Sequence, residues 1–205
     1  MTRSLSPLES DALREVANIG AGHAATALSQ MTGGRIMISV PEVILVPLDQ
    51  LPSVVGSRES PVAVVLMRVM GDFTGTTVVA WHQPAAHALC GLLLHRPMAK
   101  SPGFEPMEQS TLKETANILC SAYLSALSDF LGMMLLPSVP ELLTGSAADV
   151  LSPPTLRSGS PQNPVFCVET AFWVEGSDQT YSAEFLLLPD PAALDVIFDA
   201  IRIAS

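Results

Sequence analysis

Two copies of one polar motif are the residues of this chain best suited to chemistry: Asp11, Glu15 and Asn18 in the first half, and Ser110, Glu114 and Asn117 in the second. Within each copy the spacing is four residues and then three, which places the side chains on one face of an α-helix. No serine stands in a G-x-S-x-G turn and the histidines show no metal-binding spacing, so covalent and metal-based hydrolysis are not indicated. The motif is suited instead to presenting a carboxylate and a carboxamide to another molecule.

An internal duplication relates the two motifs. When the chain is shifted by 99 positions, residues 6–42 face residues 105–141, and 15 of the 37 pairs are identical. Chance would give roughly two or three identities at average residue frequencies. The match continues further along the chain, where Pro84-Ala85-Ala86 faces Pro191-Ala192-Ala193. We therefore predict one domain, residues 1–205, made of two repeats over about 6–96 and 105–205.

Each repeat has the pattern of a long helix, then strands, then a short helix. The long helices are predicted over residues ~7–32 and ~106–132, with Pro at the first position, Gly at the end, and Ser6 as the first N-cap. Strands are predicted at 35–47, 62–70 and 76–81 in the first repeat and at 165–174 and 181–188 in the second, with short helices from Pro84 and Pro191. The fold class is α+β, an internally duplicated α-β-β-β-α repeat sharing one sheet, with the two long helices related by a pseudo-two-fold axis.

Two segments outside these elements complete the predicted organisation. Residues 96–105 contain two prolines and a glycine and are predicted to link the repeats. The loop 144–163 is rich in Ser, Pro and Gly, and we predict it to be the least ordered part of the chain.

A narrow stripe of polar and small residues runs along each long helix. It consists of Asp11, Glu15, Asn18, Gly22, Thr26 and Ser29 in the first helix, and of Ser110, Glu114, Asn117, Ser121, Ser125 and Ser128 in the second. The remaining helix surface is apolar, which predicts a buried helix with one wet face and argues against a membrane span at 118–136. Helix faces that only contact water usually carry Lys, Glu and Arg, and asparagine is a poor helix former, so solvent exposure alone does not explain these residues. Because the stripe residues are small, another protein can approach the helix closely there.

The motifs resemble the signature of the CheC family of chemotaxis phosphatases. The first copy is Asp11-x3-Glu15-x2-Asn18 followed by the segment 19–29, and the second is Ser110-x3-Glu114-x2-Asn117 followed by Ile118. The tripeptide 40–42 (Val-Pro-Glu) and the turn 71–75 (Gly-Asp-Phe-Thr-Gly) also stand where that family has them. The resemblance covers nearly the whole chain.

This resemblance implies hydrolysis of the aspartyl phosphate on a CheY-like response-regulator receiver domain. In the family the asparagine orients the attacking water, a role that falls to Asn18 and Asn117. The glutamate forms a salt bridge with a lysine of the receiver, a role that falls to Glu15 and Glu114. The residue one turn earlier is a supporting contact: Asp11 in the first copy, Ser110 in the second. The Mg²⁺ ion belongs to the receiver, so the resemblance implies no cofactor and no metal site in this chain.

Composition and charge restrict the partners and the compartment. Ten Lys and Arg residues against 20 Asp and Glu residues give a formal net charge of −10, which disfavours nucleic acid and anionic membranes. The three cysteines have no C-x-x-C spacing and the N-terminus has no apolar signal segment, so we expect a cytoplasmic protein without disulfides. A monomer is expected, because the duplication itself supplies a two-fold arrangement.

Two other functions are open on the same residues. The first is a non-catalytic adaptor of the same fold that binds a CheD-like deamidase or a flagellar-switch component; a CheD-like protein is also a possible partner of a phosphatase of this family. Two intact Glu-x-x-Asn pairs favour the phosphatase over the adaptor. The second is a small-molecule hydrolase, which is the weakest alternative because no nucleophile constellation is present.

Overall fold

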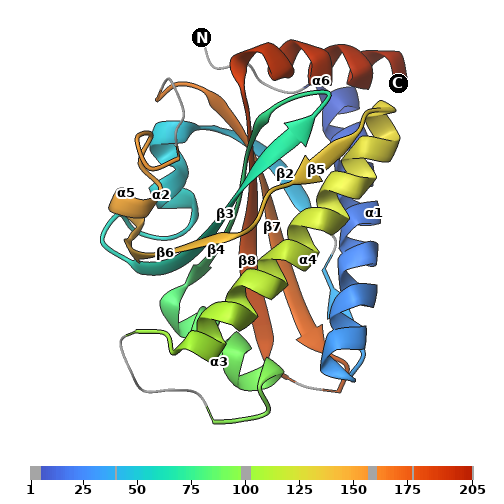
Figure 1. Ribbon diagram of the computed structural model, residues 1–205. Coiled ribbons are helices and arrows are strands. Elements are labelled where there is room, and N and C mark those ends of the chain that lie inside the picture. Colours follow the sequence, from blue (N-terminus) through green and yellow to red (C-terminus); the bar gives the residue numbers. More distant parts are fainter. Residues whose placement is uncertain (1–5, 40, 98–102, 157–160, 177, 205) are drawn as a thin grey trace.

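Six α-helices, one short 3-10 helix and eight strands make up the computed structural model, which describes residues 6–39, 41–97, 103–156, 161–176 and 178–204 (Figure 1). The helices are α1 (Pro7–Thr32), η1 (Leu48–Gln50), α2 (Leu51–Val54), α3 (Gln83–Leu93), α4 (Pro106–Leu131), α5 (Ala147–Val150) and α6 (Pro191–Ala204). The strands are β1 (Ile36–Ile38), β2 (Glu42–Pro47), β3 (Pro61–Gly71), β4 (Gly75–His82), β5 (Leu135–Pro137), β6 (Glu141–Ser146), β7 (Pro164–Val174) and β8 (Thr180–Pro189).

One antiparallel sheet contains all eight strands and is shared by the two repeats. Its central order is β7-β8-β4-β3, with β1 and β2 pairing with β7 at one edge and β5 and β6 pairing with β3 at the other. Each repeat therefore lends its first two strands to the other repeat. Such an exchange ties the two halves together through backbone hydrogen bonds.

The strand registers obey a pseudo-two-fold axis. Glu42 pairs with Glu169 across β2 and β7, and the equivalent pair across β6 and β3 is Glu141 with Leu66. At the centre of the sheet, β4 of the first repeat pairs with β8 of the second, with Val79 opposite Phe185. The predicted duplicated α+β fold with one shared sheet is confirmed.

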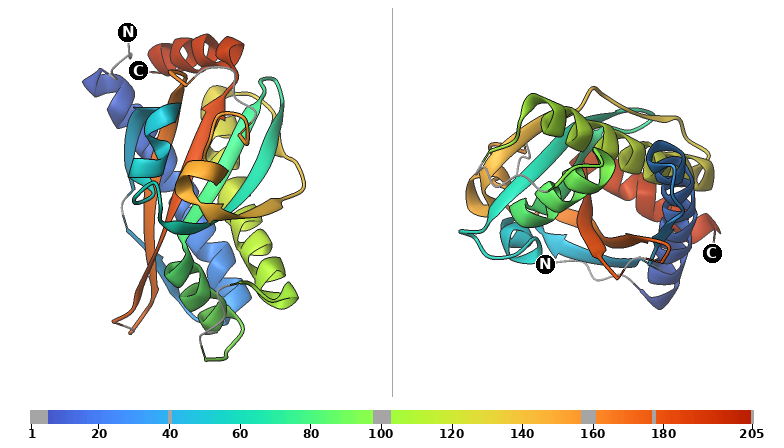
Figure 2. Two further views of the ribbon diagram at one scale, coloured as in Figure 1. Left: turned by 90° about the vertical axis from the view of Figure 1, so that its left-hand side faces the viewer. Right: turned by 90° about the horizontal axis from the view of Figure 1, so that it is seen from below.

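The two faces of the sheet are covered differently. The long helices α1 and α4 lie side by side on one face, and α3 and α6 pack at its ends (Figures 1 and 2). A smaller core on the other face is covered by η1, α2 and α5. The central strands β3, β4, β7 and β8 alternate their side chains between these two cores, as the period of two requires. Both polar motifs therefore belong to the same side of the molecule. None of the helices in the described ranges is long and apolar enough to cross a membrane.

Local signals in the sequence set the ends of the long helices. Ser6 caps α1 in a capping box with Glu9, and the helix ends at Gly33 in the left-handed region, with φ of 67°. The helix α4 ends likewise at Gly132, with φ of 65°, but it begins with Glu105 as its cap, in a capping box with Glu108. The predicted bounds of both helices are confirmed to within one residue.

The close crossing of α1 and α4 depends on Gly20. A Cβ atom at this position would lie 2.5 Å from Cδ1 and 3.0 Å from Cα of Tyr123, so only glycine lets the helices approach this closely. The Tyr123 ring stacks on Phe185 with its centroid 4.7 Å away, and its hydroxyl lies 2.8 Å from Oγ1 of buried Thr170. These contacts anchor α4 to the sheet and thereby set the spacing of the two polar stripes.

Two details of the predicted organisation need correction. The region 35–47 is two strands, β1 and β2, divided around Pro41, so each repeat has four strands where three were predicted. The segment 144–163 is more ordered than predicted: β6 continues to Ser146 and α5 follows. Leu151 and Leu156 are buried in the smaller core, on the sheet face covered by η1, α2 and α5. Apolar side chains spaced for a short helix explain this order. Residues 157–160 of that loop and 98–102 of the predicted linker lie outside the described residues.

Candidate functional site

The two polar motifs lie on the solvent-facing sides of α1 and α4. The first two members of each motif are exposed and the asparagine is half-buried; this holds for Asp11, Glu15 and Asn18 and for Ser110, Glu114 and Asn117. Equivalent positions in the two repeats thus have the same degree of burial. The structure brings the three residues of each motif onto one helix face, as the spacing predicted.

The glutamates and asparagines of the motifs are not used by the fold. Within the described part of the chain, no side chain or backbone group hydrogen-bonds or pairs with the side chains of Glu15, Asn18, Glu114 or Asn117. Asparagine in the middle of a helix also lowers helix stability relative to alanine. The polar atoms of these four residues are therefore available to another molecule.

The residues one turn earlier make contacts within their own helices. Asp11 accepts a hydrogen bond from the Arg14 guanidinium at 3.2 Å, in an ion pair whose two side chains are both largely exposed. Ser110 donates to the carbonyl oxygen of Pro106 at 3.0 Å. Exposed pairs and back-bonded hydroxyls of this kind are weak, so either group can exchange its present contact for a partner.

A groove beside the first motif was not foreseen from the sequence. It lies between α1 and the edge strand β1, has a volume of about 320 Å³, and is lined by Asn18, Ala21, Gly22, Ala25 and residues 35–39. The strand β1 reaches α1 because it pairs with β7 of the other repeat, and the backbone N–H of Ile36 donates to Ser29 Oγ at 2.8 Å. No local sequence signal announces such a long-range pairing.

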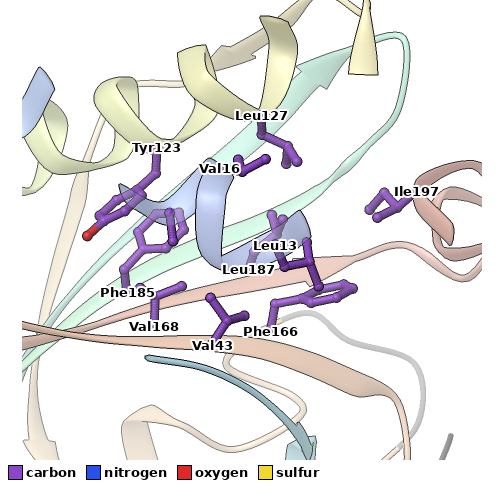
Figure 3. A pocket seen from close by; sticks show the side chains of 11 residues that line it. Leu13, Val16, Val43, Tyr123, Leu127, Phe166, Val168, Phe185, Leu187 and Ile197 are labelled. Atoms are coloured by element: carbon purple, nitrogen blue, oxygen red, sulfur yellow. The ribbon is translucent and has the colours of Figure 1, made fainter. Parts of the chain in front are cut away.

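An apolar cavity lies under α1, between the helices and the sheet (Figure 3). Its volume is about 50 Å³, and apart from the Tyr123 ring its labelled lining is aliphatic or phenylalanine, including Val16, Leu127, Phe185 and Leu187. The cavity has no polar group that could act on a substrate, so it does not compete with the helix stripes as the site.

The cysteines do not offer an alternative nucleophile. All three are buried, and burial raises the pKa of each thiol to about 12, with Glu108 adding to the effect at Cys90 and Glu184 and Glu169 at Cys167. The reactive thiolate is therefore negligible near neutral pH. Among the described residues, no group of three His, Cys, Asp or Glu side chains is placed to hold a metal ion.

Comparisons with known proteins point to one family. A model of the CheC-like family matches residues 8–45 and 107–143, which include both motifs. The chain is 32% identical over 193 residues to the CheY-P phosphatase CheC of Bacillus subtilis (strain 168), covering 93% of this chain and 92% of that protein. It is 23% identical over 140 residues to the putative CheY-P phosphatase CheC1 of Halobacterium salinarum (strain ATCC 29341 / DSM 671 / R1), covering 68% of this chain and 71% of that protein.

Solved structures share the fold. The structure of Thermotoga maritima FliY matches with a TM-score of 0.79 at 21% identity, covering 98% of this chain and 99% of that one. A chain of the CheX-CheY-BeF3-Mg+2 complex from Borrelia burgdorferi matches with a TM-score of 0.51 at 16% identity, covering 83% and 96%. At these identities the matches establish the architecture.

Proposed function

Because this chain belongs to the CheC-like family, we propose that it is a phosphatase that hydrolyses the aspartyl phosphate of a CheY-like response regulator in chemotaxis signalling. The relative named CheY-P phosphatase CheC aligns with nearly the whole chain. The observation that carries the proposal is the pair of Glu-x-x-Asn motifs, each with an exposed glutamate and a half-buried asparagine, both unused by the fold and equivalent in the two repeats. Each motif constitutes one site, formed by Glu15 and Asn18 on α1 and by Glu114 and Asn117 on α4.

The proposed chemistry is attack of water on the phosphorus of the acyl phosphate. The P–O bond to the aspartyl carboxylate breaks, and the products are the free carboxylate of the receiver and inorganic phosphate. An acyl phosphate is already activated, so holding water in line accounts for most of the acceleration. The carboxamides of Asn18 and Asn117 can do this, because each has a donor and an acceptor that no other group occupies.

The glutamates hold the receiver. Glu15 and Glu114 each stand three residues before the asparagine, so a lysine bound to the carboxylate brings the receiver's phosphate beside the carboxamide. Such an ion pair is weak while exposed to water and strengthens when docking removes the water. Mg²⁺ is part of the receiver's own site in this scheme, and the chain contributes no metal ligand.

The test follows the lifetime of a phosphorylated CheY-like receiver with and without the protein. Asn18→Ala, Asn117→Ala and the double variant run alongside, each checked for a thermal unfolding temperature no lower than that of wild type, since alanine favours the helix. We expect wild type to shorten the lifetime, each single variant to retain the activity of the other site, and the double variant to lose at least about a hundredfold, the scale of a lost positioning group.

The same experiment separates the phosphatase from the adaptor. If wild type leaves the lifetime of every receiver tried unchanged, or if the double variant is as active as wild type, the phosphatase proposal is wrong. Binding without hydrolysis would then favour the adaptor, and a pull-down with a CheD-like deamidase or a flagellar-switch component would be the next measurement.

A further inference from the structure

Gly22 lies on the α1 stripe, one turn after Asn18, and the fold gives no reason for a glycine there. A Cβ atom built at this position meets nothing within 4 Å, and the backbone is ordinary right-handed helix. Glycine is among the poorest helix formers because it loses the most backbone entropy. Gly20, two residues earlier, has the opposite environment, since it is pressed against Tyr123. The structure therefore accounts for Gly20 but not for Gly22.

The missing side chain at Gly22 opens the groove that begins at Asn18. On the helix side, Asn18 is followed along the groove by Ala21, Gly22 and Ala25, so no side chain beyond a methyl group obstructs it. The opposite wall is β1, an edge strand whose outer side has no neighbouring strand among the described residues. A backbone segment can therefore lie between α1 and β1 close to the Asn18 carboxamide.

The groove also carries a positive group where the chain as a whole is strongly negative. Arg35 lines it and is held by Glu175 at 3.1 Å in an exposed ion pair, which a stronger anion can replace. The net charge of this chain, −10, repels an acidic partner. A local cation such as Arg35 attracts a phosphorylated acidic surface to this groove.

We propose that this groove receives the segment of the phosphorylated receiver next to its aspartyl phosphate, and that Gly22 is the point at which the partner backbone approaches α1 most closely. This inference rests on the proposed phosphatase function and extends the first site from Glu15 and Asn18 to Gly22. The second repeat has Ser121 at the equivalent position. The two sites therefore differ in the room they offer, and Gly22 is a specificity-determining residue of the first.

The test is Gly22→Ala, with stability and kinetics measured together. The substitution is made in the Asn117→Ala background, where only the first site works, and in the Asn18→Ala background, where only the second works. His23→Ala is the matched control, because His23 is the exposed neighbour that does not line the groove. Gly22→Leu gives a larger obstruction at the same point.

Opposite changes in stability and docking are expected. Gly22→Ala raises the unfolding temperature by about 2–4 °C, because alanine favours the helix. At the first site it raises KM for the phosphorylated receiver at least about fivefold, and Gly22→Leu raises it further, with a smaller effect on kcat. The second site keeps its kinetics, and His23→Ala leaves both sites unchanged.

Two results overturn the inference. If Gly22→Ala and Gly22→Leu leave KM at the first site unchanged, the partner does not approach α1 there. If they slow both sites equally, the effect is on the fold and not on docking. Failure of the phosphatase proposal looks different, since no variant, including the parent with both asparagines, would then shorten the phosphoryl lifetime.

Discussion

Replacing Glu184 with glutamine is expected to stabilise the protein strongly at pH 8 and little at pH 5. Glu184 on β8 pairs directly with Glu169 on β7, which in turn pairs with Glu42 on β2, so three carboxyl groups stand in one row across the sheet. Like charges placed directly opposite on neighbouring strands destabilise a sheet. Desolvation by burial, reinforced by the negative charge of Glu169, raises the pKa of Glu184 from 4.5 to about 7.

The raised pKa of Glu184 makes the free energy of unfolding depend on pH. A carboxyl group with a raised pKa in the folded state favours folding while it is protonated, and this advantage is lost as the pH rises from the unfolded pKa through the folded one. The shift to about 7 corresponds to about 3 kcal/mol at 1.36 kcal/mol per pKa unit. Glutamine is always neutral, so Glu184→Gln removes a penalty of about 3 kcal/mol at pH 8 and of less than about 1 kcal/mol at pH 5.

Urea unfolding of wild type and Glu184→Gln at pH 5, 6, 7 and 8 measures this difference directly. Glu169→Gln is the control for the charge contribution, and it should give a smaller gain because burial is the larger cause of the shift. The row lies on the sheet face opposite α1 and α4, so phosphatase activity serves as a check on the fold. A stability difference that is the same at pH 5 and pH 8 would show that the Glu184 carboxyl does not carry this penalty.

Two further predictions concern the contacts that hold α1 and α4 in place. Gly20→Ala should lower the free energy of unfolding by about 1–3 kcal/mol, because the added methyl would lie 2.5 Å from Cδ1 of Tyr123. An unchanged midpoint of urea unfolding would show that the two helices do not pack this closely at Gly20. Tyr123→Phe should cost about 1–3 kcal/mol by leaving the buried Thr170 hydroxyl without its partner. Adding Thr170→Val should recover most of that loss, and a double variant as unstable as the sum of the single ones would show that the hydroxyls do not interact.

The long helices and their motifs could be read from the sequence because their determinants are local. Capping by Ser6, termination at Gly33 and Gly132, and the side chains three and four residues apart all depend on neighbours within one or two helical turns. The duplication repeats the terminal glycine and the motif spacing, although α4 begins with Glu105 where α1 has Ser6. The placement of Glu15, Asn18, Glu114 and Asn117 on exposed helix faces therefore followed from spacing alone, whereas their roles remain predictions that the proposed kinetics will test.

The pairing of the strands depends on long-range contacts. The exchange of β1 and β2 onto β7, and of β5 and β6 onto β3, depends on contacts between residues more than 60 positions apart, which no local pattern encodes. That exchange creates the groove beside Asn18 and aligns Glu42, Glu169 and Glu184. Local signals thus set the helices and the residues on their faces, whereas the surroundings of those residues come from the long-range pairing of the strands.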